Sequence, residues 1–116
     1  MFLAFLRFKD MSDQLLPLLV FDLSCHSEVV VDHHLVITST DQNSAGYRLR
    51  GIIYFGHHHF TSRFVSHHEV VWYHDGLVTG SSLINEGTLE SVDLSRRGSL
   101  VVTATLYEKE TSPHSY

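Results

Sequence analysis

The sequence predicts a mainly β protein built on an antiparallel sheet, and three observations support this fold class. Several short segments alternate apolar and polar residues with the period of two that strands require, most clearly over residues 47–55 and 60–65. Those segments are rich in β-branched and aromatic residues, whereas Gly, Ser, Asn and Asp gather between them. No stretch of useful length carries the 3.6-residue periodicity of an amphipathic helix.

The elements are expected in the following order along the chain. A buried strand over 15–23 (LLPLLVFDL) is entered after Pro17, and two short strands or one bent strand cover 29–31 and 35–38. Residues 39–46 (STDQNSAG) form a loop of turn-favouring residues. Four strands, separated by turns, make the main sheet: 47–55, 60–65, 70–74 and 100–107. Residues 79–87 are expected to be irregular, 89–94 to be a short strand or edge piece, and 96–98 to be a polar turn.

Length and composition indicate one globular domain. A chain of 116 residues is large enough for a single modest core. We divide it into an N-terminal segment over 1–14, a folded domain over 15–108 and a polar tail over 109–116. The formal net charge of −5 leaves no basic surface, so nucleic acid is not an expected partner. The 10 histidines make the actual charge depend on pH near neutrality.

The termini and the cysteine content indicate a cellular compartment. Residues 1–10 (MFLAFLRFKD) begin apolar, but Arg7 and Lys9 interrupt the run, and no basic start or small-residue cleavage site is present. This run is too short to span a bilayer, so we read it as a short buried segment or the remnant of a longer protein. The single cysteine, Cys25, excludes an intrachain disulfide and fits a reducing compartment. We expect a soluble, intracellular protein of the cytoplasm or nucleus, not secreted and without a membrane partner.

The stretch 56–80 is expected to form a hairpin that brings a histidine to an aspartate. If 66–68 is the loop, antiparallel pairing sets His59 opposite Asp75 and Arg63 opposite Val71, and the Cβ atoms of directly opposed residues lie about 5 Å apart. We expect His59 to lie opposite Asp75 or diagonal to it. The other face of the same hairpin carries Phe60, Phe64 and Trp72, and we expect these aromatic side chains to form core. The face with His59 and Asp75 is therefore where chemistry is expected.

Five segments, taken in order, resemble the C-terminal half of the catalytic domain of ubiquitin-specific proteases, which are papain-like cysteine peptidases. They are LLPLLVFDL, YRLRGIIYF, HHHFTSRFV, VVWYHDG and LVVTATLY, and the resemblance covers about residues 15–108. It implies that His59, followed by Phe60-Thr61-Ser62, is the catalytic histidine and that Asp75 orients it. In such a site the imidazole takes the thiol proton and the carboxylate fixes its tautomer. The resemblance also implies the β-rich half of a papain-like fold, deubiquitinating activity, ubiquitin or a ubiquitin-like protein as partner, and no cofactor.

Two departures from the family pattern limit this expectation. The family has glycine where this chain has His58, a bulky residue where a substrate tail would approach. The family also carries its nucleophile in an N-terminal Cys box, and nothing in this sequence matches one, because Cys25 (LSCHSEV) follows the first strand. We therefore expect a partial domain that is inactive alone and leaves an apolar face uncovered, and whether it is an enzyme stays open. The alternative is a non-catalytic β-scaffold that binds a partner, which could be ubiquitin-like.

Simpler interpretations remain open for each of these residues. His59 and Asp75 could be an ordinary cross-strand polar pair, contributing about 0.2–1 kcal/mol. Cys25 could be a structural thiol, since only the adjacent His26 would favour its reactivity. The histidine clusters suggest zinc, but neighbouring strand residues point to opposite faces and share an ion poorly, so no metal is expected. Arg48 and Arg50 could meet a partner that carries carboxylates or could simply lie on an exposed strand face.

Overall fold

The computed structural model describes residues 15–23, 29–77, 80 and 82–111, and over these residues the fold is mainly β, as predicted. The regular elements are eight strands and one 3-10 turn. They are β1 (Leu18–Asp22), β2 (His34–Thr38), β3 (Ser44–Gly56), β4 (His59–Val65), β5 (Val70–His74), β6 (Ile84–Thr88), η1 (Leu89–Ser91), β7 (Arg96–Arg97) and β8 (Leu100–Lys109). No described helix is long and apolar enough to cross a membrane.

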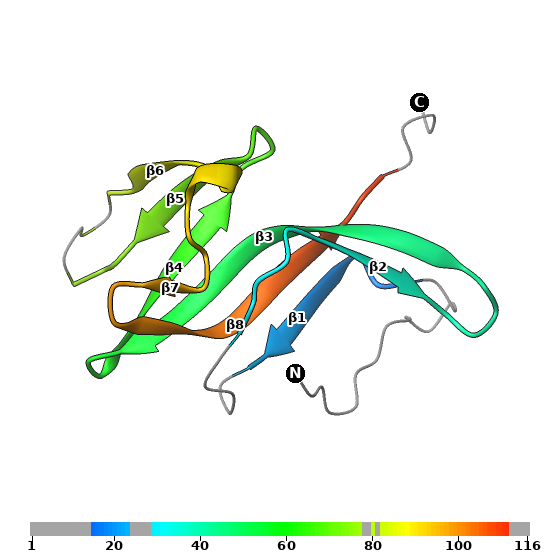
Figure 1. Ribbon diagram of the computed structural model, residues 1–116, viewed down its shortest axis with the longest axis horizontal. Helices are drawn as coiled ribbons and strands as arrows, with labels where there is room; N and C mark the ends of the chain where they lie inside the picture. Colours follow the sequence, from blue (N-terminus) through cyan, green and yellow to red (C-terminus); the bar gives the residue numbers. More distant parts are fainter. Residues whose placement is uncertain (1–14, 24–28, 78–79, 81, 112–116) are drawn as a thin grey trace.

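All strand pairs are antiparallel and belong to one twisted sheet with the order β1-β8-β3-β4-β5-β6 (Figure 1). The long strand β3, of 13 residues, organises the sheet because it pairs with β8, β4 and β2. Its first residues pair with β2 and its last residues with β4, while β8 runs along nearly its whole length. The two-residue strand β7 pairs with the start of β8.

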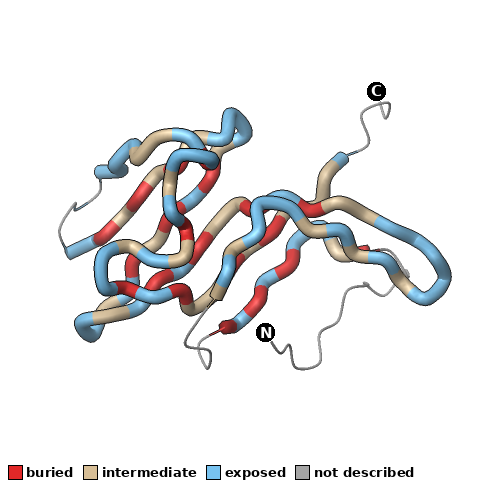
Figure 2. The backbone as a smooth tube through the Cα atoms, in the orientation of Figure 1, coloured by how far each residue is buried: buried red, intermediate tan, exposed pale blue. Residues whose placement is uncertain are grey.

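One face of this sheet, the inner face, carries the core. Residues of the 29–37 and 84–97 segments pack against it, and burial alternates along β1, β4 and β5 (Figure 2). The fully buried large side chains all come from β3 and β5: Tyr47, Tyr54, Leu49, Ile52 and Val71. Polar residues are buried on the same face, namely Thr61, Arg63, Asp75 and Thr105.

Arg63 is the centre of a buried polar network on the inner face. Its Nε atom donates to Glu86 at 2.6 Å and its Nη1 atom donates to the Tyr54 hydroxyl at 2.9 Å. Nη1 also lies 2.8 Å from the Asp93 carbonyl oxygen, so the guanidinium ties β4 to the covering segment. Arg97 donates to the other oxygen of Glu86 at 2.7 Å. Burial alone would raise the pKa of Glu86, but the two arginines lower it overall.

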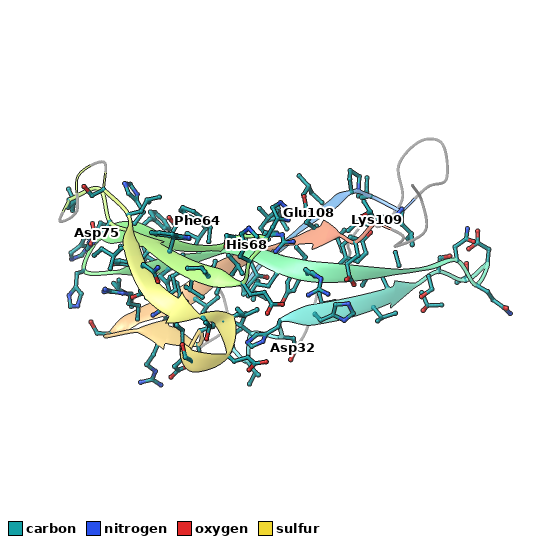
Figure 3. The ribbon with its side chains drawn as sticks, turned by 90° about the horizontal axis from the view of Figure 1, so that it is seen from above. Asp32, Phe64, His68, Asp75, Glu108 and Lys109 are labelled. Atoms are coloured by element: carbon teal, nitrogen blue, oxygen red, sulfur yellow. The ribbon has the colours of Figure 1, made fainter. Side chains whose placement is uncertain are left out.

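The opposite face, which we call the outer face, presents apolar side chains to solvent. One row crosses the sheet through successive pairs, from Val20 to Leu106, Gly51, Phe64 and Trp72. Val20 is 60% exposed and Phe64 38%, and Figure 3 shows Phe64 on the side of the sheet away from Asp32. No described segment covers this row.

The aromatic residues of the hairpin correct one expectation. Phe60 and Phe64 do not form core, because Phe60 is 61% exposed and Phe64 is partly exposed as well. Trp72 is half-buried. Alternation correctly separated the two faces, but the covering segments pack on the face of Arg63, whose charge is neutralised there by Glu86. The Phe55 and Phe60 rings lie 4.6 Å apart on the outer face and shield each other in part.

Several element boundaries also differ from the expectations. β1 alternates between exposed and buried residues, because it is an edge strand with an open outer face, rather than being buried throughout. Residues 29–31 form no strand, and the expected irregular stretch contains β6. Residues 89–91 form a 3-10 turn instead of a strand, and β8 continues to Lys109. The N-terminal segment 1–14 and Cys25 lie outside the described residues.

Candidate functional site

The β4–β5 hairpin positions the candidate site, and its loop differs from the predicted one by a single residue. The Ser66 N–H donates to the Val70 carbonyl at 3.0 Å, and the Glu69 N–H donates to the Ser66 carbonyl at 2.9 Å. The loop is therefore 67–69, with Glu69 at a φ of 61°, which is the left-handed third position common in three-residue hairpin loops. The Ser66 hydroxyl also accepts the N–H groups of His68 and Val70 at 3.3 and 3.2 Å.

Moving the loop centre by one residue moves every cross-strand pair by two. Arg63 lies opposite Tyr73 and Val65 opposite Val71, so the predicted pair of Arg63 with Val71 is wrong. Of the two arrangements expected for His59 and Asp75, the structure shows the diagonal one. A shift of two keeps each side chain on its own face, whereas a shift of one would have reversed them. His59 and Asp75 are therefore diagonal neighbours on the inner face.

The two residues nevertheless meet. His59 Nε2 lies 3.1 Å from Asp75 Oδ2, a normal hydrogen-bond distance. Asp75 is 5% exposed, whereas the His59 side chain is 24% exposed. The site thus combines a buried carboxylate with an imidazole that solvent can reach.

Asp75 is fixed by its own strand end. The Leu77 N–H donates to Oδ1 at 3.0 Å, so the turn that follows β5 holds one carboxylate oxygen. The other oxygen, Oδ2, faces His59 and also lies 3.5 Å from the Tyr73 hydroxyl. Because separate donors face the two oxygens, the carboxylate is held in the orientation in which it meets the imidazole.

His59 is positioned by a tight turn between β3 and β4. The turn residues His57 and His58 both have positive φ angles, 51° and 65°, as a two-residue hairpin turn with right-handed strand twist requires. Glycine or asparagine favours these angles, so His58 stands in backbone where a side chain is disfavoured. The His57 side chain contacts the Ser99 hydroxyl at 2.5 Å and ties the turn to the start of β8.

The surroundings of His59 favour its protonated form. The hydrogen bond with Asp75 raises the pKa of the imidazole above its ordinary 6.5, and the carbonyl oxygen of His57, 3.4 Å from Nδ1, raises it further. Partial burial opposes both effects, but the pKa is raised overall. The physical reason is that an imidazolium carries N–H groups on both ring nitrogens and can donate to both oxygens, whereas a neutral ring can donate to one.

This arrangement can hold and move a proton. With Nε2–H directed to Asp75, Nδ1 is the nitrogen that can accept a proton from a neighbouring group, and the carboxylate stabilises the resulting cation. Cys25, which does not match a Cys box, lies outside the described residues.

Other residues around the pair escaped sequence reasoning. The hydroxyl of Thr61, next to His59 on the inner face, is buried and has no hydrogen-bond partner among the described residues. Nothing in the sequence marks this threonine, the Tyr73 hydroxyl or the His57 carbonyl as neighbours of the pair, because each contact depends on the hairpin register. The Asp75-Gly76 dipeptide is typical of turns, and it alone indicates in the sequence that a turn could fix the Asp75 carboxylate.

The arginines and histidines show different pairings from those considered above. Arg48 pairs with Glu110 and Glu69, and Arg50 pairs with Glu108, so carboxylates of the same chain meet them. Glu110, in the expected polar tail over 109–116, therefore belongs to the folded part of the chain, and His34 also contacts it. Within the described part of the chain, no group of three or more potential ligand residues could hold a metal ion.

Comparisons with known proteins identify no relative of this chain. No family model, no curated protein and no solved structure matches this chain.

Proposed function

We propose that this chain carries the base and its orienting carboxylate from a cysteine peptidase site of the ubiquitin-specific protease type, acting in an intracellular compartment. His59 is the base, Asp75 is the orienting residue, and a conjugate of ubiquitin or a ubiquitin-like protein is the substrate. The observation that carries the proposal is the 3.1 Å contact between His59 Nε2 and the buried Asp75 carboxylate. The segment order set out in the sequence analysis supports the choice of family.

The chemistry assigned to the pair is a proton transfer. In a complete site, the thiol proton passes to Nδ1 of His59, and the thiolate attacks the carbonyl carbon of the scissile bond. Asp75 stabilises the imidazolium while it exists, and the protonated ring later returns its proton to the leaving amine. The raised pKa of His59 favours this cationic intermediate state.

Alone, the chain should not cleave ubiquitin conjugates, because the thiolate performs the covalent step and the sequence has no Cys box. A ubiquitin-based, thiol-reactive probe tests this directly on the purified chain and on Cys25→Ser and His59→Ala variants. We expect no labelling of any of the three. Labelling of the unmodified chain that is lost in both variants would show that Cys25 serves as a nucleophile and would overturn the proposal of an inactive partial site.

Ubiquitin binding tests the substrate part of the proposal. Titration of the isotope-labelled chain with ubiquitin should shift the NMR resonances of His59 and of the His57–His58 turn. Since these residues are exposed or half-exposed at one end of the sheet, a substrate tail could reach them. If ubiquitin leaves all of these resonances unchanged at millimolar concentration, the assignment of a ubiquitin-type substrate is wrong.

The outer face favours a second candidate function, a non-catalytic module that binds a ubiquitin-like protein. Exposed aromatic and aliphatic side chains on one contiguous face are typical of protein contacts. The same titration separates the two candidates when it is repeated on Phe64→Ser and His59→Ala variants. Loss of binding in Phe64→Ser with binding kept in His59→Ala would favour the binding module, and the reverse pattern would favour the peptidase site.

A further inference from the structure

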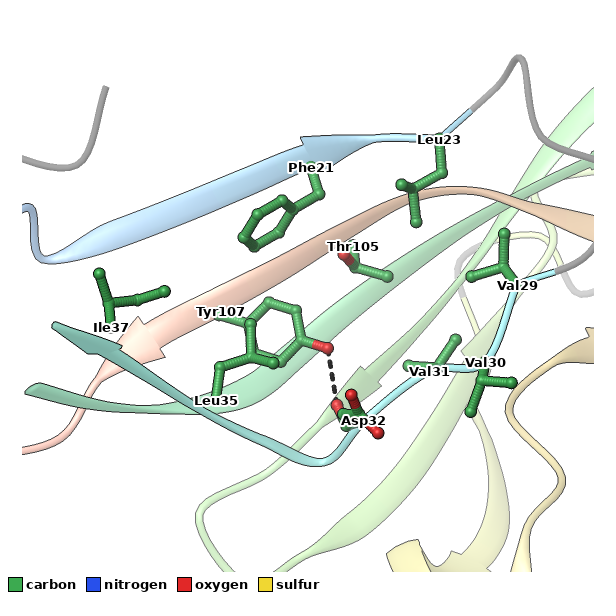
Figure 4. Close-up of a pocket in the computed structure, with 10 residues that line it drawn as sticks. All are labelled: Phe21, Leu23, Val29, Val30, Val31, Asp32, Leu35, Ile37, Thr105 and Tyr107. Carbon is green, nitrogen blue, oxygen red and sulfur yellow. Dashed lines mark hydrogen bonds between the residues drawn. The ribbon is translucent and has the colours of Figure 1, made fainter. Parts of the chain in front are cut away.

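A hollow lies on the inner face, away from His59 and Asp75, between the sheet and the segment that covers it (Figure 4). It has a volume of about 170 Å³ and is partly open to solvent. Its floor comes from β1 and β8, and its roof from β2 and the residues that lead into it. The lining residues are Phe21, Leu23, Val29, Val30, Val31, Asp32, Leu35, Ile37, Thr105 and Tyr107. None of them belongs to the His59–Asp75 pair.

The walls of this hollow are almost entirely apolar, and one of its two hydroxyl groups is already engaged. The Tyr107 hydroxyl donates to the Asp32 carbonyl oxygen at 2.6 Å, a contact that Figure 4 draws between the covering segment and β8. Burial, followed by the charge of Asp32, raises the pKa of Tyr107 to about 12, so this hydroxyl keeps its proton at neutral pH. It therefore fastens the roof to the floor and is not available to a ligand.

The second hydroxyl is that of Thr105. Thr105 is 4% exposed and lines the hollow next to Phe21 and Tyr107, and Figure 4 marks no hydrogen bond between its hydroxyl and the other lining residues. A ligand hydroxyl that enters the hollow can therefore exchange a hydrogen bond with Thr105 in place of water. The hollow thus offers a largely apolar lining with one hydroxyl group in its wall.

We propose that this hollow binds a small, uncharged ring compound that carries one hydroxyl group, such as a phenol. The size fits, because an apolar cavity of about 150 Å³ in another protein takes up benzene. The chemistry fits as well, because the ring contacts the aliphatic walls and Phe21 while its hydroxyl pairs with Thr105. An anionic ring compound is excluded from the interior, since Asp32, the one charged residue in the lining, is acidic and could not compensate the loss of the anion's hydration.

Titration of the isotope-labelled full chain with three probes tests the proposal: p-cresol, toluene and benzoate. We expect p-cresol to give saturable NMR shifts at Leu35, Thr105 and Tyr107, with a Kd on the order of a millimolar or below. Toluene should bind at the same place about 2- to 10-fold more weakly, because it lacks the hydroxyl. Benzoate should give no saturable shifts at these residues.

Two pairs of variants make the test specific. Thr105→Val keeps the shape of the side chain but removes the hydroxyl, so p-cresol and toluene should then bind equally. Val31→Phe fills the hollow and should abolish binding of both, whereas Val36→Phe, at a residue that is 63% exposed on β2, should leave binding unchanged.

Three results would each overturn the proposal in whole or in part. Absence of saturable shifts for p-cresol in the unmodified chain would show that the hollow takes up no ring compound. Equal binding of benzoate would show that the shifts report another site. A preference for p-cresol that survives in Thr105→Val would remove Thr105 from the recognition. Because the first two results need no variant, they do not depend on how well the variants fold.

Discussion

The two faces of the sheet are built from alternate residues of the same strands, yet they differ in almost every physical respect. The inner face buries Arg63 among hydrogen-bond partners from the covering segment. The outer face leaves Phe60 and Val20 about as exposed as many polar surface residues, at 61% and 60%. The comparison teaches that hydrophobicity alone does not decide which face becomes the core. The face that is covered is the one on which the connecting segments can satisfy buried polar groups.

Replacing the buried Arg63 on the inner face should cause the largest loss in the free energy of unfolding. Arg63→Met leaves Glu86, the Tyr54 hydroxyl and the Asp93 carbonyl without their donor, so we expect a loss of about 3–5 kcal/mol in the free energy of unfolding. The matched control is Arg48→Met, because the Arg48 side chain is 48% exposed in its ion pairs. That variant should lose less than about 1 kcal/mol. Urea unfolding followed by tryptophan fluorescence measures both, and equal losses would contradict the asymmetry.

Two valines compare the apolar packing of the two faces. Val71 on the inner face is fully buried, so Val71→Ala should cost about 2 kcal/mol through lost burial and the cavity that remains. Val101 is 51% exposed, and Val101→Ala should change the free energy of unfolding by less than about 0.5 kcal/mol. The same urea titration measures both. A large loss at Val101 would mean that something covers the outer face in solution.

Removing an aromatic side chain from the outer face should change association more than stability. Phe60→Ser forfeits the ring contact with Phe55, which corresponds to about 1 kcal/mol. It also breaks the exposed apolar surface, so sedimentation velocity should show less self-association than in the unmodified chain. If the unmodified chain is already monomeric at high concentration, the outer face is not a self-association surface.

The smallest expected effect concerns pH and the rim of the inner face, where His59 lies. The pKa of His59 is raised in the folded state, so the folded chain binds the proton on His59 more tightly than the unfolded chain does. The resulting stabilisation is complete below the ordinary value of 6.5 and disappears as the pH rises through the raised folded value. Asp75→Asn should return the titration of His59 toward its ordinary value. An NMR pH titration of the His59 ring measures this, and an unchanged titration in the variant would contradict the assigned cause.

The strands of the main sheet could be predicted from alternation, whereas their covering could not. Residues 47–55 and 70–74 lie within observed strands because their β-branched and aromatic residues agree with their environment. β6 escaped prediction because its sequence, INEGT, has little strand propensity and pairs with β5 through backbone contacts. The exposed aromatic face escaped it because alternation assigns residues to faces without identifying the face that other segments cover.

The contact between His59 and Asp75 could be predicted because an error of two residues in the hairpin register leaves both side chains on the same face. The loop of the β4–β5 hairpin has no glycine to mark its left-handed position, and Glu69 occupies that position instead of the expected strand position. The resulting error of two residues kept His59 and Asp75 on one face and within reach of each other. The contacts that tune the pair, from the His57 carbonyl and the Leu77 N–H, depend on backbone geometry that residue patterns do not encode.

The place of β8 between β1 and β3 has a consequence for how the sheet assembles during synthesis. β3, β4, β5 and β6 are joined by consecutive hairpins and can pair as the ribosome delivers them. β1 is made before them, but its only partner among the described strands is β8, so that Leu18 meets Glu108 across nearly the whole chain. Closing so long a loop is entropically costly and slow. β1 therefore stays unpaired until β8 has been translated, and a chain that stops short of β8 loses both the partner of β1 and the support of β3.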